Sequence, residues 1–415
     1  MKTVPDPRCA RKKKHDLAEV LMCLVIGYLC GKTTLRRSLE WARRHLKWLR
    51  KFMPLENGIA SVATASRLLS GIDEELFSYA FMEWIGEILK TRGIHIVIDG
   101  KALKAAGSKV RGTRAPMILN ALDAATGLVI AQLPIADKSC ELAGLPKLLE
   151  LLDIRESTVT IDAIGTHTNI MESIVRKNGH FVFMVKKNQP DSYAEITSLL
   201  EELSEEYKKA KENAMYISKY AEEMESYTES VTCDKNRDRH EYRTYRSCHA
   251  VDWLTKTESE WSFVRTIGQA KQVRILSVQD KDGNDITPDP ETFLKEGSAR
   301  QKKPESDDDE ATVLSVGMVS DRILSAAEMG KYKREHWVIE NALHYVLDSS
   351  FQEDRSPAKK SRNNLALIRK FVYNIIRIAS LRETGQKPFL LMMDEFADDL
   401  SFVERYVFKG IESLD

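Results

Sequence analysis

The chain has 415 residues and no formal net charge, with 43% hydrophobic and 30% charged residues. This is the composition of an ordinary globular protein, and the length exceeds what a single compact core usually holds. The six cysteines are scattered without a C-x-x-C pair, so they suggest neither a zinc site nor a disulfide framework and favour a reducing, intracellular setting.

Residues 15–91 repeat apolar side chains at helical spacing, which predicts an all-helical N-terminal domain over residues 1–91. The longest apolar run, Leu17 to Cys30, contains Glu19 and is too short to span a bilayer, so no membrane partner is expected. The predicted helices are Leu17–Cys30, Leu35–Phe52, Ala63–Leu69 and Glu74–Leu89.

The tetrapeptide GKTT at residues 31–34 resembles the end of a phosphate-binding loop. That motif requires a glycine where Ile26 stands, and it follows a strand, whereas these flanks are helical. We therefore expect no nucleotide cofactor and predict that Gly31 ends a helix.

The pattern changes at Gly93 to short β-branched runs separated by helical segments. Three strands, a helix, a strand, a helix and a strand predict an α/β domain over residues 92–190, with a mixed five-stranded sheet and flanking helices. The predicted strands are 94–99, 117–124, 127–136, 157–163 and 180–186, and the helices are 141–152 and 168–177.

Residues 191–320 begin with a long charged helix and continue with strand-like pieces, which predicts a largely β insertion. Within it, residues 280–310 are rich in Gly, Pro, Asp and Lys, and a mobile loop is expected there. The chain then becomes helical over 321–383, and residues 384–415 form an acidic tail.

Basic residues concentrate in two runs, Lys32 to Lys51 and Arg355 to Arg382. Such patches can bind phosphates, although a charge run is more often a solvated helix face. Two runs in one chain leave the two interpretations about even.

Carboxylates occupy three positions suited to metal chemistry. Asp99 and Asp162 each end a predicted strand, where ligand sites of α/β folds gather, and the helix 336–354 offers Glu340. Neighbouring carboxylates repel each other unless a cation is present, and oxygen ligands suit Mg²⁺ or Mn²⁺. Each residue also has a simpler interpretation, because an Asp after a strand is often a turn former and this helix could have an ordinary polar face.

Other residues of the same helix are ranked by their position. Asn341 and His344 lie one residue and one turn from Glu340 and are expected to orient the carboxylate or contact the substrate. For His344, packing and function are equally good interpretations, and Trp337 is expected to be a packing residue. Asp348, two turns away, is expected to pair with a nearby basic residue.

Blocks of sequence spread in order over most of the chain form one pattern. The blocks are residues 6–31, 57–73, IDGKALK (98–104), 137–153, VTIDAIGTH (159–167), 184–190 and REHWVIENALHYVLDSSFQEDRSPAKKSRNNLALIRKFVYNIIR (334–377). In these blocks the chain resembles the DDE transposases of bacterial insertion sequences, specifically the H-repeat-associated group.

This resemblance implies an RNase H-like catalytic fold of the retroviral integrase superfamily, with the family's catalytic and metal-binding acids at Asp99, Asp162 and Glu340. It implies two Mg²⁺ ions, or Mn²⁺ in their place, that serve DNA strand cleavage and strand transfer at the ends of the element. The long gap before Glu340 fits the predicted insertion at 191–320. The N-terminal helical block resembles the family's associated domain, which is implied to bind DNA.

The implied partners are double-stranded DNA, as terminal inverted repeats and target DNA, and further copies of the chain. The implied location is the bacterial cytoplasm, at the nucleoid. Lys101 and Lys104 are expected beside the first acid, as orienting or DNA-contacting residues. Further expected DNA contacts are Lys186, Lys187, Lys359, Lys360, Arg362, Arg36, Arg37, Arg43 and Arg44.

The sequence departs from the family pattern at several points. Ser61-Val62-Ala63-Thr64 replaces the usual Ser-His-Asp-Thr, and His167 replaces a usual Gln. His336 and Leu347 stand where broader relatives have Arg and Lys around the glutamate. None of these changes removes a carboxylate, so they concern recognition of the DNA end more than the chemistry.

Two other functions stay open at this stage. A domesticated or catalytically silent relative would bind DNA without cutting it. An RNase H-like nuclease would hydrolyse DNA without joining it. A metabolic phosphotransferase is less favoured than either, because no nucleotide-binding loop is present.

Overall fold

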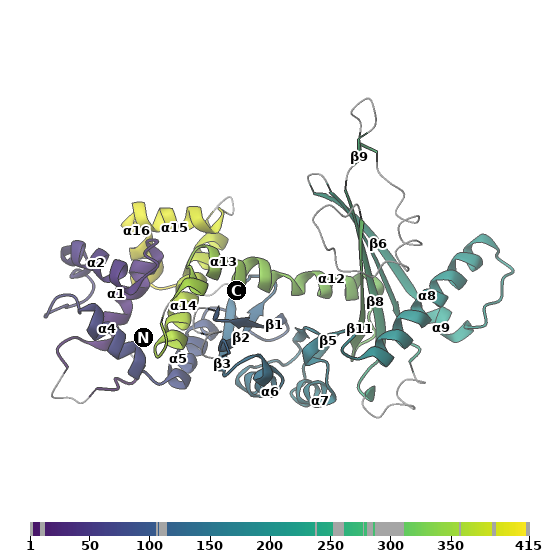
Figure 1. Cartoon of the computed structure of the whole chain (residues 1–415), viewed down its shortest axis with the longest axis horizontal. Coiled ribbons are helices and arrows are strands. Elements are labelled where there is room, and N and C mark those ends of the chain that lie inside the picture. Colours follow the sequence, from purple (N-terminus) through teal and green to yellow (C-terminus); the bar gives the residue numbers. More distant parts are fainter. Residues whose placement is uncertain are drawn as a thin grey trace. The chain divides into compact units, whose positions relative to one another are not determined.

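The structure is a computed structural model of the chain, and its elements are drawn in Figure 1. It describes residues 3–8, 13–104, 107, 114–236, 239–251, 261–276, 278–279, 285–286, 311–356, 358–383 and 387–411. The chain forms two compact units: unit 1 joins Met1–Ser157 with Trp337–Asp415, and unit 2 is Thr158–His336. The predicted boundaries at 91/92 and 383/384 are therefore not boundaries between these units.

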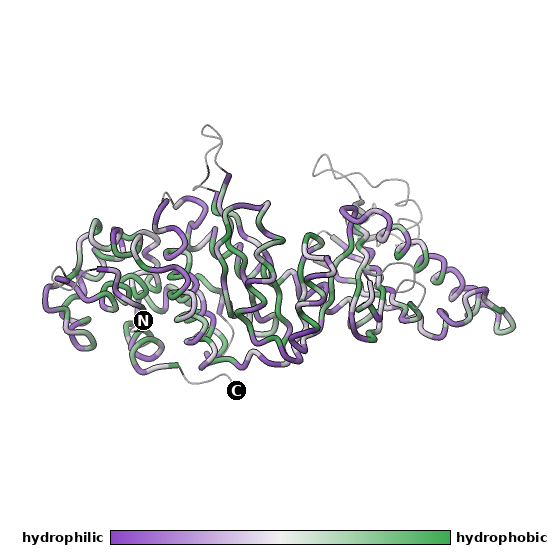
Figure 2. The backbone as a smooth tube through the Cα atoms, turned by 90° about the horizontal axis from the view of Figure 1, so that it is seen from below, coloured by the Kyte–Doolittle hydropathy of each residue, from purple (hydrophilic) through white to green (hydrophobic). Residues whose placement is uncertain are grey.

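Unit 1 begins with five helices that confirm the predicted helical block. The predicted helix Leu35–Phe52 is interrupted at His45. Figure 2 colours the backbone by hydropathy and shows apolar and polar residues interspersed along the chain. The helices are α1 (Leu17–Leu29), α2 (Leu35–Arg44), α3 (Leu46–Leu49), α4 (Val62–Gly71) and α5 (Glu74–Gly86).

Short polar side chains fix where these helices begin and end. Thr34 and Ser61 each accept a hydrogen bond from the amide three residues further on, which starts α2 and α4. Thr64, the other residue kept from the family's N-terminal motif, bonds Ser61 through its hydroxyl at 3.0 Å. Gly31 follows α1 with φ of 74°, so the prediction that it ends a helix is confirmed.

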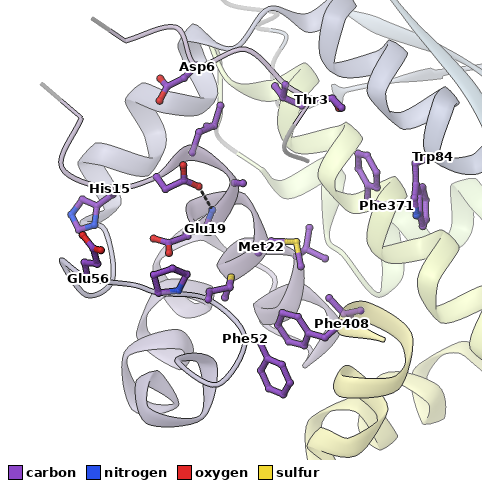
Figure 3. Close-up of a pocket in the computed structure, with 18 of the residues that line it drawn as sticks. Thr3, Asp6, His15, Glu19, Met22, Phe52, Glu56, Trp84, Phe371 and Phe408 are labelled. Carbon is purple, nitrogen blue, oxygen red and sulfur yellow. Dashed lines mark hydrogen bonds between the residues drawn. The ribbon is translucent and has the colours of Figure 1, made fainter. Parts of the chain in front are cut away.

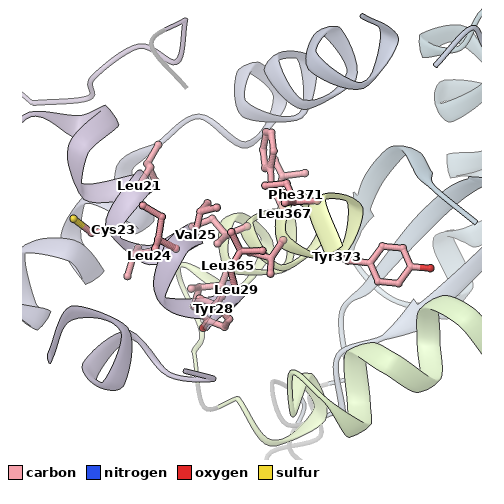
Figure 4. Close-up of a cluster of buried hydrophobic side chains, with 14 of the residues drawn as sticks. Leu21, Cys23, Leu24, Val25, Tyr28, Leu29, Leu365, Leu367, Phe371 and Tyr373 are labelled. Atoms are coloured by element: carbon pink, nitrogen blue, oxygen red, sulfur yellow. The ribbon is translucent and has the colours of Figure 1, made fainter. Parts of the chain in front are cut away.

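The core of unit 1 forms where α1 packs against α14 (Arg362–Arg382). Figure 4 shows Leu24 and Leu29 of α1 facing the part of α14 that carries Leu365 and Phe371. Most of α14 is buried, including Lys370 at 1% exposure, so the helix is not the phosphate-facing surface that its charge run predicted. The remaining helical elements of this end are α13 (Tyr345–Ser349), η7 (Glu353–Arg355), α15 (Phe389–Asp398), α16 (Leu400–Val403) and η8 (Glu404–Phe408).

Three antiparallel strands stand beside these helices in unit 1. They are β1 (His95–Ala102), β2 (Met117–Asp123) and β3 (Val129–Ile135), followed by η3 (Lys138–Cys140) and α6 (Glu141–Leu151). Strand β1 extends three residues beyond the predicted end at Asp99. The Asp99 carboxylate therefore comes from inside the strand, opposite Asn120 of β2, and the prediction that Asp99 ends its strand is wrong.

Unit 2 contains strands in the order β4-β5-β11-β8-β7-β6, with β4 parallel to β5 and the other pairs antiparallel. The predicted insertion thus extends the sheet of β4 and β5, because β11 pairs directly with β5. The strands are β4 (Thr158–Ile161), β5 (His180–Val185), β6 (Thr228–Asn236), β7 (Arg239–Cys248), β8 (Thr266–Leu276) and β11 (Ala311–Ser320).

The helical elements of unit 2 are η4 (Ala163–Gly165), α7 (Thr168–Arg176), α8 (Pro190–Glu212), α9 (Ala221–Ser226) and α12 (Ala326–His336). Strands β9 (Val278–Gln279) and β10 (Asp285–Ile286) form a separate pair. Apart from β10, the predicted loop 280–310 lies outside the described residues. The mixed α/β class is confirmed. Within the described ranges, no helix combines the length and hydropathy that crossing a bilayer requires.

The close approach of α1 and α2 depends on Gly27. A Cβ at this position would lie 2.5 Å from Ser38 Cβ and 2.7 Å from Ser38 Cα. We expect Gly27→Ala to destabilise unit 1 by about 1–3 kcal/mol through overpacking, measured by chemical denaturation. Gly86→Ala is the control, because nothing lies within 4 Å of its Cβ position, and it should be neutral or slightly stabilising. Equal stability of the two variants would contradict this assignment.

Candidate active site

Asp99, Glu340 and His344 converge at one place in unit 1. One potential ligand atom from each lies within 4.8 Å of those of the other two. His344 Nδ1 is 3.4 Å from Glu340 Oε2 and 3.6 Å from Asp99 Oδ2. The structure therefore brings together two of the three predicted catalytic acids, with the imidazole of His344 beside them.

A π-helical turn, η6 (Ile339–His344), carries Glu340 and His344. In the chain, η6 follows α12 and precedes α13. The segment predicted as one helix over residues 336–354 is therefore helical here, but it contains a π-helical turn. Such turns are rare and occur frequently at functional sites. Ile339 and Leu343 are buried on one side of the turn, while the Glu340 side chain is 53% exposed.

The two carboxylates have opposite electrostatic surroundings. Burial raises the pKa of Asp99, and the charge of Glu340 raises it further. The hydrogen bond from His344 lowers the pKa of Glu340. A buried carboxyl beside an ionised one is costly to charge, so a cation placed between them would stabilise both.

Asn120 determines which nitrogen of His344 faces the acids. Its Nδ2 donates to Ile118 O at 3.2 Å and lies 3.4 Å from His344 Nε2. Since an amide nitrogen only donates, Nε2 accepts this bond and the imidazole proton is on Nδ1, between the carboxylates. His344 is 6% exposed, and its Nδ1 is placed to donate to Glu340 Oε2 and lies close to Asp99 Oδ2.

Sequence reasoning missed Asn120 and a second residue, Glu141 of α6. Glu141 is buried, and its charge also raises the pKa of Asp99. A Cβ at Gly100 would lie 2.9 Å from Glu141 Oε1, so the glycine next to Asp99 leaves room for this carboxylate. Asn120 could have been found as the amide in the otherwise apolar run MILNAL, whereas nothing marks Glu141 in the sequence.

The lysines that follow Asp99 are held by carboxylates of the helical segment after Glu340. Lys101 Nζ lies 2.6 Å from Asp348 Oδ2, which confirms the predicted structural role of Asp348. Lys104 Nζ lies 2.8 Å from Asp354 Oδ2. The Lys101 side chain is 7% exposed and that of Lys104 is 73% exposed, so Lys104 is the better placed to meet a phosphate.

Asn341 of the π-helical turn and Trp337 before it are both exposed. Asn341 is exposed, and its backbone amide donates to Trp337 O. Trp337 is 56% exposed, so the prediction that it is a packing residue is wrong.

Asp162, the predicted second acid, belongs to unit 2. It directly follows β4, as predicted, and begins η4. Lys186 Nζ donates to Asp162 Oδ1 at 2.5 Å. Burial opposes ionisation, but the hydrogen bond and charge of Lys186 lower the pKa of Asp162. Lys186, expected to contact DNA, is thus an ion-pair partner of the second acid in this structure.

The other residues predicted to contact DNA differ in their solvent exposure and in whether they already have a hydrogen-bond partner. Arg36, Arg37 and Arg44 are exposed on α2, and Lys187 is exposed after β5. Arg43 bonds Glu40 and Ala60 O. Lys359 and Lys360 are exposed before α14, while Arg362 is half-buried and donates to Lys359 O.

Unit 1 also contains a pocket of about 1330 Å³ that is lined by other side chains (Figure 3). Met22, Phe52 and Phe408 form part of an apolar wall, and Glu19 accepts a hydrogen bond from Leu55 N. None of the predicted site residues is among the described residues that line it. The carboxylates, and not this pocket, are therefore the candidate centre of chemistry.

Comparison with protein families gives two matches that together cover most of the chain. Residues 90–375 match the Transposase DDE domain, and residues 1–85 match the DDE_Tnp_1-associated domain. The chain belongs to the DDE transposase family. The matched transposase domain contains Asp99, Asp162 and Glu340.

Two relatives of this transposase align with it over most of both chains, and both are named as putative transposases. It is 27% identical to "Putative transposase YncI" of Escherichia coli O157:H7, over 90% of this chain and 85% of that protein. It is 28% identical to "H repeat-associated putative transposase YhhI" of Escherichia coli K12, over 88% and 84%. The piggyBac transposase in a synaptic complex with hairpin DNA aligns at TM-score 0.39 and 11% identity, over 97% of this chain and 75% of that chain.

The ion pair of Lys101 with Asp348 is expected to stabilise the transposase more than that of Lys104 with Asp354. Asp348→Asn should lower the free energy of unfolding by about 1–3 kcal/mol, because it leaves the buried Lys101 ammonium without its closest counter-charge. Lys104→Gln is the control and should change it by less than about 1 kcal/mol, since its ammonium is solvated. Urea unfolding measures both, and a larger effect at Lys104 would contradict the ranking.

Proposed function

We propose that this transposase cuts DNA at the ends of an insertion element and joins the freed 3′-hydroxyls to target DNA, with Mg²⁺ as the working metal. One observation carries the proposal: Asp99 and Glu340, two of the three acids in the family pattern, lie together with His344. A site of this kind suits phosphodiester chemistry, because charge develops on phosphate oxygens during the reaction and a cation compensates for it.

The residues fit the divalent metal that the family uses. The carboxylate oxygens of Asp99 and Glu340 are ligands of the kind that Mg²⁺ and Mn²⁺ prefer, and a cation would offset the burial and the charge of Glu340 that raise the pKa of Asp99. We propose that Asp162 of unit 2 completes the set and that two ions bind. When bound, such ions activate a water or 3′-hydroxyl for attack and stabilise the leaving oxygen.

The protein's own groups orient this site. His344 Nδ1 lies 3.4 Å from Glu340 and 3.6 Å from Asp99 and so can orient both carboxylates, while Asn120 contacts the ring at Nε2. Lys104 lies near the first acid and can exchange its partner Asp354 for a DNA phosphate. The ion pair with Lys186 keeps Asp162 ionised and therefore ready to bind a cation.

Element ends must be paired during transposition, so we propose that the working form is an oligomer on terminal inverted repeats. A strand-transfer assay with end-containing DNA tests the chemistry. Asp99→Asn, Asp162→Asn and Glu340→Gln should each reduce joined product by on the order of 10³-fold or more, as should chelation of the metal. Asp398→Asn is the control, since this carboxylate is exposed on α15, and it should leave joining unchanged.

The alternatives give different results in the same assay. Joining at wild-type level by Asp99→Asn or Glu340→Gln would remove the catalytic assignment. Binding without any cleavage in Mg²⁺ or Mn²⁺ would identify a DNA-binding relative without catalysis. Cleaved DNA without joined product would identify a hydrolytic nuclease.

His344 is expected to set how well the carboxylates bind the metal. His344→Ala removes the donor between Asp99 and Glu340, so the Mg²⁺ concentration for half-maximal cleavage should rise about 10- to 100-fold. Tyr345→Ala is the control, because this neighbour is 69% exposed, and it should leave the metal requirement unchanged. A lower rate at saturating Mg²⁺ with the same half-maximal concentration would contradict a positioning role.

A further inference from the structure

A groove of about 570 Å³ lies entirely in unit 1, outside the carboxylate site. One wall is the start of α2 together with Ser66 and Ser70 of α4. The opposite wall is the segment from Gln352 to Ser361, which links α13 to α14. Segments more than 280 residues apart in the chain therefore meet here, since Arg36 and Arg355 line the same groove.

The lining of this groove is basic and rich in hydroxyl groups. Among the described residues that line it, no aspartate or glutamate occurs. Arg36, Arg355, Lys359 and Lys360 are exposed, and no carboxylate of the described part of the chain pairs with them. The hydroxyl groups come from Thr33, Thr34, Ser66, Ser70, Ser356 and Ser361.

A buried arginine adds to this charge at the floor. Arg369 is 3% exposed and its guanidinium lies over the Tyr28 ring, 5.9 Å from the centroid. One terminal nitrogen donates to Glu353 Oε1 at 3.1 Å, but the buried Nε has no partner among the described residues. Glu353 itself does not line the groove. A donor of this kind is costly to leave unmet, and an anionic oxygen reaching the floor, directly or through water, would satisfy it.

Two helices also begin at the groove. Thr34 and Leu35 mark the start of α2, and Lys360 and Ser361 mark the start of the 21-residue α14. Helix starts present unpaired amides and partial positive charge. The Ser361 side chain makes no capping bond, so the first amides of α14 keep their capacity for another acceptor.

We propose that this groove binds the sugar–phosphate backbone of duplex DNA, as a second DNA site beside the catalytic one. Exposed cations on two walls match the repeated charge of the backbone, and the hydroxyl groups suit contacts to phosphate oxygens. The proposal rests on the proposed function in naming DNA as the ligand. It goes further in assigning to one groove the residues that hold the DNA.

The turn η7 connects this groove to the catalytic strand. In this turn Arg355 lines the groove, while Asp354 lies 2.8 Å from Lys104 Nζ and 4.0 Å from Lys101 Nζ. Lys101 lies on β1, two residues after Asp99, and Lys104 follows the end of that strand. The turn therefore links a residue of the groove to the lysines that follow Asp99.

Fluorescence anisotropy of the full chain with end-containing duplex in EDTA tests the groove independently of catalysis. Lys359→Ala/Lys360→Ala should weaken binding by at least about 10-fold at low salt and reduce the slope of log K against log salt by about 2. Arg36→Ala, on the opposite wall, should reduce the slope by about 1. The matched control is Lys147→Ala/Lys409→Ala, which removes two exposed charges of unit 1 outside the groove.

The outcomes separate this proposal from the catalytic one. If the variants of both walls bind the duplex more weakly and the control variant does not, the groove is supported as a DNA site, even if the wild-type protein cuts no DNA. Groove variants that bind like the control overturn it, whether or not the protein transposes DNA. Tighter binding of duplex RNA than of duplex DNA also overturns it. All variants alter exposed side chains, and unchanged thermal midpoints will show that the loss is not unfolding.

Discussion

Unit 1 depends on the burial of one polar helix, α14. Its apolar face packs on α1, but the side chains of Asn364, Lys370 and Asn374 are buried as well, and each of these three makes hydrogen bonds. Asn364 donates to Leu69 O and Ile72 O at the end of α4, and Lys370 donates to Gln132 of β3. Because a buried polar group without a partner costs about 1–3 kcal/mol, these bonds fix α14 in one position.

The same helix also completes the edge of the small sheet. The side-chain amide of Asn374 both accepts from Val129 N at 2.9 Å and donates to Val129 O at 2.8 Å, as a neighbouring strand would. The N-terminal helices, the sheet and the segment after Glu340 are therefore joined through one element. This explains why a helical block that resembles a separate domain in the sequence shares a core with the C-terminal part of the chain.

The candidate site uses this rigid frame to hold charges that repel each other. Asp99 comes from inside a strand and Glu340 from a π-helical turn, and His344 lies beside both acids while Asn120 contacts its ring. The basic residues are divided in a similar way. Arg369 and Lys370 are buried in α14, and Lys359 and Lys360 just before it remain exposed. The same run of basic residues thus contributes buried hydrogen bonds, made by Arg369 and Lys370, and an exposed basic surface that suits phosphate.

The sequence alone determined the helical block, the strands of Asp99 and Asp162, the helical segment of Glu340 and the family, because periodicity and motifs are local properties. It also identified Asp348 as the partner of a basic residue. Only the tertiary structure decided that β1 continues past Asp99, that Trp337 is exposed and that α14 is buried. It also revealed Asn120 and Glu141 beside Asp99. These features depend on which segments pack together, and neither apolar spacing nor charge count records that long-range pairing.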